Sequence, residues 1–258
     1  MVRSWSLMLA CVLLLPVVSA TAQDPSARLT YEVASVRASD PARERGSVQP
    51  LPNGVGYTVD GLPLRSMLSV MYRIPVRQIS GGPEWVNTQN FDVYGRTDRT
   101  YSIDDLHLMF ENLLADRFNL KLHMVQEPGP VYVLRVAKSG LKMKAVPEGT
   151  GRRSPIWDSA DGVTADRVQL NYLCYWLGQI LQSDQRPVVD ATGLRGNYDF
   201  TLRFRMPEEP GAGGDDGRSE DLPTIFKALR DQLGLELTPE KGTVPRLVID
   251  HVEKPSAN

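Results

Sequence analysis

The feature that most constrains the fold of this chain is an internal repeat. Residues 115–138 align with residues 230–253 without a gap, and five of the 24 positions are identical. Upstream of each segment the same signals recur in the same order: an apolar helical pattern, a Pro-Val pair, a glycine six residues after that proline, and an aromatic-Asp-apolar run. A repeated plan of this length predicts two similar halves of roughly 110 residues each.

Apolar residues at helical spacing predict two helices in each half. In the first half they lie at 64–72 and 106–114, and in the second half at 170–181 and 222–229. Ser102 precedes the second of these helices by a few residues, and its hydroxyl is expected to cap the helix together with Asp105. Pro223 would lie in the first turn of the last helix.

Runs of alternating apolar and polar residues predict the strands. Short strands precede the helices, and an aromatic-rich strand lies between the two helices of each half. After the second helix, residues 118–122 and 131–137 predict a hairpin, and residues 233–237 and 246–252 predict its counterpart in the second half. Each half is therefore expected to be β-α-β-α-β-β.

The predicted fold class is α+β, with antiparallel or mixed sheets, each covered by two helices. The two halves would be residues 23–146 and 147–258, forming two domains or one compact domain. Loops are expected at residues 40–53, 148–159 and 206–220, since these stretches lack periodicity. The last is acidic but lacks the ligand spacing of a calcium loop, which favours a solvated loop.

Residues 1–22 predict a secretory signal peptide. Arg3 precedes an apolar run of about a dozen residues, followed by small residues that favour cleavage before Gln23. The run is shorter than the roughly 20 residues that a membrane-spanning helix requires. An uncleaved anchor and a lipoprotein acylated at Cys11 are the alternatives. We expect an exported protein, periplasmic or extracellular, without an integral membrane segment after signal removal.

Composition argues against several classes of function. With 29 Lys and Arg against 31 Asp and Glu, the net charge is −2, so the chain has no basic field to attract nucleic acid. Two cysteines and three histidines predict no metal centre and no cofactor. Cys174, the second cysteine, lies on the apolar stripe of a predicted helix and is expected to be buried.

Several specific strings carry a family resemblance. They include QISGGPEW at residues 78–85, PVVDATGLRGNYDF at 187–200 and VIDHVEKPSAN at 248–258. In these strings and their order the chain resembles the soil-associated family of exported proteins of unknown function, a domain also found appended to membrane metallopeptidases of the β-lactam-sensor type. The resemblance implies an extracytoplasmic location and assigns no catalytic residues. HExxH is absent from the chain, so a sensor role is analogy only.

No motif for a nucleophile elbow, a P-loop or a zinc protease is present. The densest polar run contains Asp190, Arg195 and Asp199, which could present groups to a ligand or could stabilise their own turn and strand. Trp85 follows a Gly-Gly-Pro turn, and it is expected either to anchor a partner or to fold over the sheet edge. These four residues are the candidate binding residues; catalytic residues cannot be assigned.

Two classes of function remain. The first is a non-enzymatic extracytoplasmic module that binds a protein, peptide or glycan through a sheet edge or groove. The second is a hydrolase of an envelope or extracellular polymer, with Asp190, Asp199 or His251 in its site. The two differ in one observable respect, which is whether titratable groups converge in a concave site.

Overall fold

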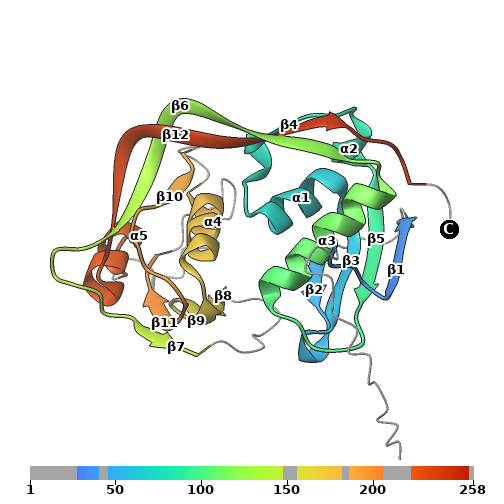
Figure 1. Ribbon diagram of the computed structural model, residues 1–258. Helices are drawn as coiled ribbons and strands as arrows, with labels where there is room; N and C mark the ends of the chain where they lie inside the picture. Colours follow the sequence, from blue (N-terminus) through green and yellow to red (C-terminus); the bar gives the residue numbers. More distant parts are fainter. Residues whose placement is uncertain (1–27, 41–45, 148–155, 182–185, 206–221, 256–258) are drawn as a thin grey trace, which may run out of the picture.

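The computed structural model describes residues 28–40, 46–147, 156–181, 186–205 and 222–255. The predicted signal peptide and the acidic loop at 206–220 lie outside these residues. Two groups of helices and strands stand side by side, and two long strands run across both of them (Figure 1). The predicted α+β class is confirmed.

The first half contains an antiparallel sheet in the order β1-β5-β3-β2. Two helices, α1 and α3, pack beside this sheet, as Figure 1 shows, and the short helix α2 lies at one end of them. The elements are β1 (Val33–Ala38), β2 (Ser47–Pro50), η1 (Pro52–Gly54), β3 (Gly56–Pro63), α1 (Leu64–Tyr72), η2 (Val76–Gln78), α2 (Trp85–Thr88), β5 (Asn90–Arg96) and α3 (Ile103–Arg117).

The second half contains another antiparallel sheet, in the order β7-β11-β9-β8. Helices α4 and α5 accompany it, and α5 continues into η4, a turn of π-helix. Its elements are β7 (Lys144–Val146), β8 (Ile156–Ser159), β9 (Gly162–Val168), α4 (Leu170–Ile180), β11 (Asn197–Arg203), α5 (Ile225–Ala228) and η4 (Leu229–Leu233).

The two predicted hairpins are wrong. Each pair of expected strands is one continuous long strand, β6 (Lys121–Val136) or β12 (Leu235–His251). These two strands pair antiparallel with each other along nearly their whole length, with Gly129 opposite Gly242. We call this pair the ribbon. β4 (Ile79–Gly81) pairs parallel with β12, and β10 (Val188–Asp190) pairs parallel with β6, so the ribbon is the centre of a third, mixed sheet.

Two large buried clusters form the core, one in each half. The first is built around α1, α3 and the β1-β5-β3-β2 sheet, and it also includes Leu247 and Ile249 from β12. The second is built around α4, α5 and the β7-β11-β9-β8 sheet, and it includes Tyr132 and Leu134 from β6. The ribbon therefore contributes apolar side chains to both clusters.

Local signals account for several helix boundaries. The Ser102 hydroxyl accepts a hydrogen bond from the backbone N–H of Asp105 at 3.1 Å, so the predicted cap of α3 is confirmed. The last helix begins after Thr224, whose hydroxyl accepts from the N–H of Lys227, and not at Pro223. Strands β2 and β8 lie within two stretches expected to be loops, and they form the edges of their sheets. The internal duplication itself stays a prediction.

Candidate functional site

A hollow in the described part of the chain lies between the two halves, as two adjoining cavities. The larger has a volume of about 1400 Å³ and is lined by α1, the start of α3, the β2-β3 region, β8 and α4. The smaller, of about 520 Å³, lies between α3, α4, β10 and the ribbon. Both cavities share four lining residues, Arg73, Asp104, His107 and Tyr175. We call the two cavities together the cleft.

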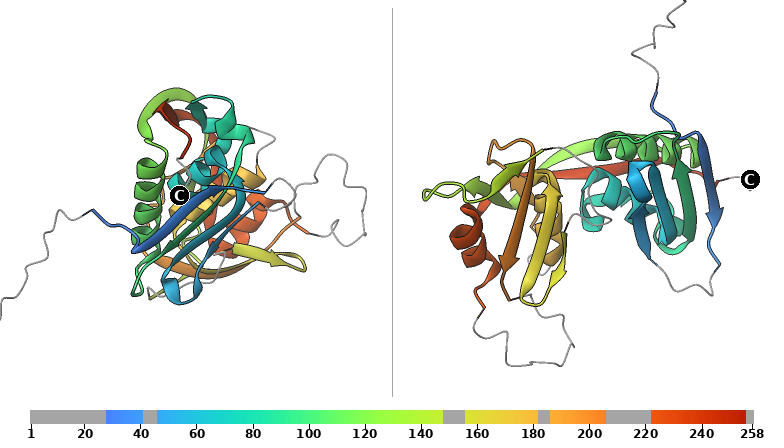
Figure 2. Two further views of the ribbon diagram at one scale, coloured as in Figure 1. Left: turned by 90° about the vertical axis from the view of Figure 1, so that its right-hand side faces the viewer. Right: turned by 90° about the horizontal axis from the view of Figure 1, so that it is seen from below.

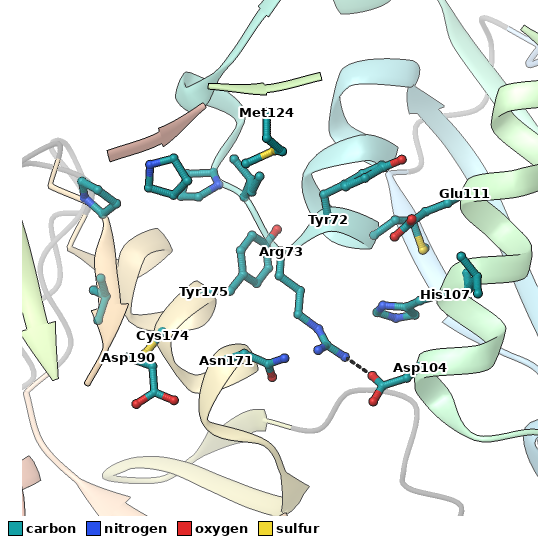
Figure 3. A pocket seen from close by; sticks show the side chains of 17 residues that line it. Tyr72, Arg73, Asp104, His107, Glu111, Met124, Asn171, Cys174, Tyr175 and Asp190 are labelled. Carbon is teal, nitrogen blue, oxygen red and sulfur yellow. Dashed lines mark hydrogen bonds and ion pairs between the residues drawn. The ribbon is translucent and has the colours of Figure 1, made fainter. Parts of the chain in front are cut away.

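Arg73 lies where the two cavities meet, at the end of α1. Its backbone adopts the left-handed conformation, with φ 53° and ψ 40°, and its N–H caps the last turn of the helix. This conformation ends α1 and directs the side chain between α3 and α4 (Figure 3). One guanidinium nitrogen donates to Asp104 at 3.0 Å and another donates to Gln169 at 3.3 Å. Arg73 is therefore bonded to both halves.

One face of α3 presents three titratable side chains to the cleft. Asp104, His107 and Glu111 are spaced i, i+3 and i+7, so they lie on the same side of the helix. They all line the smaller cavity. Figure 3 shows this row of side chains facing α4 and Asn171 across the space that Arg73 crosses.

The environment separates the pKa values of these groups. Burial lowers the pKa of His107 to about 4, helped by the charge of Arg73 and opposed by Asp104 and a hydrogen bond to the Met71 carbonyl. Burial raises the pKa of Glu111 to about 6, although its hydrogen bond with Tyr72 and the charge of Arg73 act in the opposite direction. Near neutral pH the imidazole is uncharged and the Glu111 carboxyl is close to its titration range.

The pKa of Asp104 is shifted in the opposite direction from that of Glu111. Partial burial acts to raise its pKa, but hydrogen bonds from Gln169 and Arg73, together with the charge of Arg73, outweigh burial and lower it. The Gln169 amide donates to the second carboxylate oxygen at 3.2 Å. Arg73, Asp104 and Gln169 thus form a closed triangle of polar contacts between the halves, which we call the Arg73 triangle.

Two further contacts join the halves beside the cleft. The hydroxyls of Ser69 on α1 and Tyr175 on α4 are 3.3 Å apart. Arg77 donates to the carbonyls of Gly178 and Arg186 at 3.2 and 3.3 Å. The halves are thus connected both by the ribbon and by side chains on the opposite walls of the cleft.

Cys174 and Asp190 lie on the α4 side of the smaller cavity (Figure 3). Cys174 is a free thiol that is only 5% exposed, so the prediction that it is buried is confirmed. Burial is the main cause that raises the pKa of this thiol, and the nearby Asp190 carboxylate adds to the effect. The thiol therefore stays protonated and unreactive at neutral pH.

A family model covers most of the chain and includes parts of both halves. Residues 65–252, from the first turn of α1 to just beyond β12, match the family described as protein of unknown function (DUF3738). The chain belongs to this family. No curated protein and no solved structure matches the chain. The match assigns no activity to DUF3738, and the soil association and the metallopeptidase context stay predictions.

The residues singled out from the sequence do not converge in this DUF3738 chain. Asp190 lines the smaller cavity, but its carboxylate accepts from the backbone N–H and the hydroxyl of Thr192 in its own turn. Arg195 is exposed and lines neither cavity, and its carbonyl accepts from the hydroxyl of Tyr198. His251 lies at the end of β12, 2.8 Å from the Glu253 carboxylate.

Asp199 has a clear structural contact. Its carboxylate accepts the backbone N–H of Arg167 at 2.7 Å, where the pairing of β9 and β11 is bulged and Arg167 has a φ of 52°. Asp92 does the same in the first half, accepting the N–H of Gly61 in a bulge of β3 at 3.1 Å. Both aspartates thus satisfy an N–H that the sheet ladder leaves without a partner.

Trp85 packs onto the first core. Its ring stacks on Phe118 with a centroid distance of 6.2 Å, and its edge contacts Phe91. The side chain of Lys254 lies over the ring, 5.8 Å from its centroid. Trp85 is half-buried in this position, which corresponds to the second of the two expectations, a ring that folds back onto its own half.

The sequence carries one signal for the cleft, in the polar residues of α3. The apolar stripe of α3 was identified from its spacing, but the polar residues beside that stripe, Asp104, His107 and Glu111, repeat with the same helical period. Arg73 and Gln169 carry no such signal, because Arg73 follows a helix and Gln169 precedes one, and both reach the cleft only through the packing of the two halves.

Within the described residues, no group of three or more His, Cys, Asp or Glu side chains is placed to hold a metal ion, and no helix there has the length and apolarity to cross a membrane.

Proposed function

We propose that this DUF3738 chain is an exported, extracytoplasmic binding protein that holds a ligand of about the size of a short peptide in the cleft between its halves. The observation that carries this proposal is the larger cavity, about 1400 Å³ in volume and lined from both halves. Ligand sites in proteins are concave, mostly apolar and provided with a few convergent polar groups, and they are common where two structural units meet.

The lining of the larger cavity agrees with this description. Aromatic side chains from both halves form much of its walls: Tyr57, Tyr101, Trp157, Tyr172 and Tyr175. The Arg73 triangle adds two charged groups and an amide to the lining. Aromatic walls supply contact area with little loss of side-chain entropy, and a fixed polar cluster supplies orientation.

A cleft-filling substitution tests the proposal. Ser66 on α1 lines the larger cavity and is half-buried, so Ser66→Trp places a large ring in the space without removing a core residue. The matched control is Val33→Trp on the edge strand β1, where Val33 is 59% exposed and lines neither cavity.

Binding of the neutral fluorescent probe N-phenyl-1-naphthylamine is measured by titration for residues 23–258. We expect Ser66→Trp to weaken binding at least about tenfold, which corresponds to about 1.4 kcal/mol, and Val33→Trp to leave it unchanged. Equal binding by all three proteins overturns the assignment to the cleft. Export is tested separately by N-terminal sequencing of the protein from the periplasm or medium, with Gln23 as the expected first residue.

One observation favours a second candidate function, a hydrolase. Glu111 lies in the smaller cavity beside Tyr72 and His107, and burial brings its pKa to about 6, which suits a general acid near neutral pH. Chromogenic glycosides and peptide anilides, tested with the wild type and Glu111→Gln, separate this function from binding alone. A hydrolase predicts turnover that Glu111→Gln reduces by a factor of about 100 or more.

A further inference from the structure

Arg73 has hydrogen-bonding capacity that its protein partners do not use. A guanidinium has five N–H donors in a planar fork. In the described part of the chain, the Nε atom of Arg73 is buried and has no hydrogen-bond partner, while the two terminal nitrogens donate to Asp104 and Gln169. A buried donor without a partner is costly, and an acceptor that reached it would lower that cost.

The two partners of the ion pair are unequally exposed. The side chain of Arg73 is 14% exposed, whereas the side chain of Asp104 is 60% exposed. The arginine is therefore fixed by its surroundings and by the left-handed end of α1, and the aspartate approaches it from the open side. Another carboxylate arriving through the cavity can take the place of Asp104 without moving Arg73.

The charges around the larger cavity favour an acidic ligand. Among its lining residues, Arg73 and Arg167 are the cations and Asp104 is the carboxylate. His107 is uncharged at neutral pH. Arg167 is already paired with Asp166 at 3.4 Å, so displacement of Asp104 frees the guanidinium of Arg73 alone, and an apolar environment strengthens its attraction for an anion.

The walls next to Arg73 are suited to an apolar or aromatic body. Val70 and Val76 lie on the α1 side, and Tyr172 and Val168 lie on the side of the second half. An acid that carried only polar groups would leave these walls without contacts, whereas an amphiphilic acid covers them while its charged end reaches the guanidinium.

We propose that the ligand is an amphiphilic acid, in which an apolar or aromatic body carries one acidic group that binds Arg73 in place of Asp104. This inference rests on the proposed function, and it adds the chemical class of the ligand and a role for two residues. Arg73 binds the acid, and Asp104 occupies the same position in the absence of ligand.

Two probes with the same ring system test the inference. 8-Anilinonaphthalene-1-sulfonate carries an acidic group, and N-phenyl-1-naphthylamine is its neutral counterpart. Both are titrated at pH 7.5 and fixed ionic strength into the wild type, Arg73→Gln, Arg73→Lys and Asp104→Asn. Arg195→Gln is the matched control, because Arg195 is exposed and lines neither cavity.

The proposal predicts effects of opposite sign at the two partners. Arg73→Gln weakens binding of the sulfonate at least about tenfold, since a charge-assisted hydrogen bond is lost, and changes binding of the neutral probe less than about twofold. Arg73→Lys gives an intermediate loss, because the ammonium keeps the charge without the planar fork. Asp104→Asn tightens sulfonate binding severalfold, because it removes the competing carboxylate. Arg195→Gln changes neither probe.

Several results would overturn the proposal. Equal weakening of both probes by Arg73→Gln means that Arg73 is part of the wall, and weaker sulfonate binding by Asp104→Asn means that the ion pair is structural. If Arg73→Gln fails to fold, as judged by circular dichroism, Asp104→Asn alone decides by the direction of its effect. If the wild type binds the neutral probe as tightly as the sulfonate, only this inference is refuted and the proposed function stands. If Ser66→Trp weakens neither probe, the proposed function fails as well.

Discussion

Acidification from pH 7 to pH 4 should destabilise this protein through His107. In the folded state, burial and the charge of Arg73 bring the pKa of His107 to about 4, against the opposing effects of Asp104 and the Met71 carbonyl. In the unfolded chain the imidazole titrates near 6.5. Between these values the unfolded state binds a proton that the folded state does not, so the free energy of unfolding falls as the pH falls.

The magnitude follows from the separation of the two pKa values. Each unit corresponds to 1.36 kcal/mol, so a separation of about 2.5 units gives about 3.4 kcal/mol at full strength. The ring is half-buried and faces the cleft, so solvent screening reduces this to about 2 kcal/mol. The contribution is fully present above pH 6.5 and is lost as the pH falls toward 4.

Urea unfolding followed by tryptophan fluorescence measures the effect at pH 7, 6, 5 and 4, for the wild type and His107→Gln. The substitution removes packing and a hydrogen bond at every pH, so the informative quantity is the difference between the two proteins. We expect this difference to shrink by about 2 kcal/mol from pH 7 to pH 4. A difference that stays constant across this range refutes the reasoning, because the imidazole then titrates equally in both states.

Three further predictions concern a second titratable group, a backbone position and the ribbon. Burial raises the pKa of Glu111 to about 6, so above that pH the carboxyl ionises in the folded state at a cost in stability that the unfolded chain does not pay. Glu111→Gln removes this cost, and it should stabilise the protein by about 1 kcal/mol at pH 7.5, after allowance for partial exposure, and by nothing at pH 4.5, in urea titrations. Gly81→Ala should lower the free energy of unfolding by more than about 2 kcal/mol in the same assay, because Gly81 has a φ of 79° and an added Cβ would lie 2.4 Å from the Ile249 carbonyl oxygen. The matched control is Gly82→Ala, where an added Cβ has contacts no closer than 3.4 Å, and it should lower the free energy of unfolding by about 1 kcal/mol. A fragment of residues 23–146 lacks the part of β12 that completes the first core, so it should show no cooperative thermal transition by circular dichroism.

The helices and most strands could be predicted because their signals are local. The pairing of the long strands could not. Pro128, Gly129 and Pro130 are typical of a turn, yet they lie within β6. The ribbon is only two strands wide there, because β4 pairs with residues 247–249 and β10 with residues 132–134. A proline is tolerated in a strand that has a free side, since its missing N–H then leaves no ladder bond unmade.

The site was harder to predict than the fold for a related reason. Its residues come from α1, α3 and the segment before α4, and they meet only because the two halves face each other. The polar period of α3 was visible in the sequence, but nothing local indicated that this face would be covered by the other half. Asp190, Arg195 and Asp199 formed a conspicuous cluster in sequence, and yet Asp190 and Asp199 bond to turn and strand backbone.

The cleft lies beside the part of the ribbon that connects the two halves and is only two strands wide. The right-hand view of Figure 2 shows the ribbon crossing from one half to the other. Both cores include side chains from the ribbon, so each end of it is fixed, and its two-stranded middle connects the halves. Away from the ribbon, the halves meet through the Arg73 triangle, the Ser69 and Tyr175 hydroxyls and the bonds from Arg77. The pair of Arg73 and Asp104 lies within the first half, and the bonds of both residues to Gln169 cross to the second half, so a ligand that displaces Asp104 acts on a cluster that joins the halves.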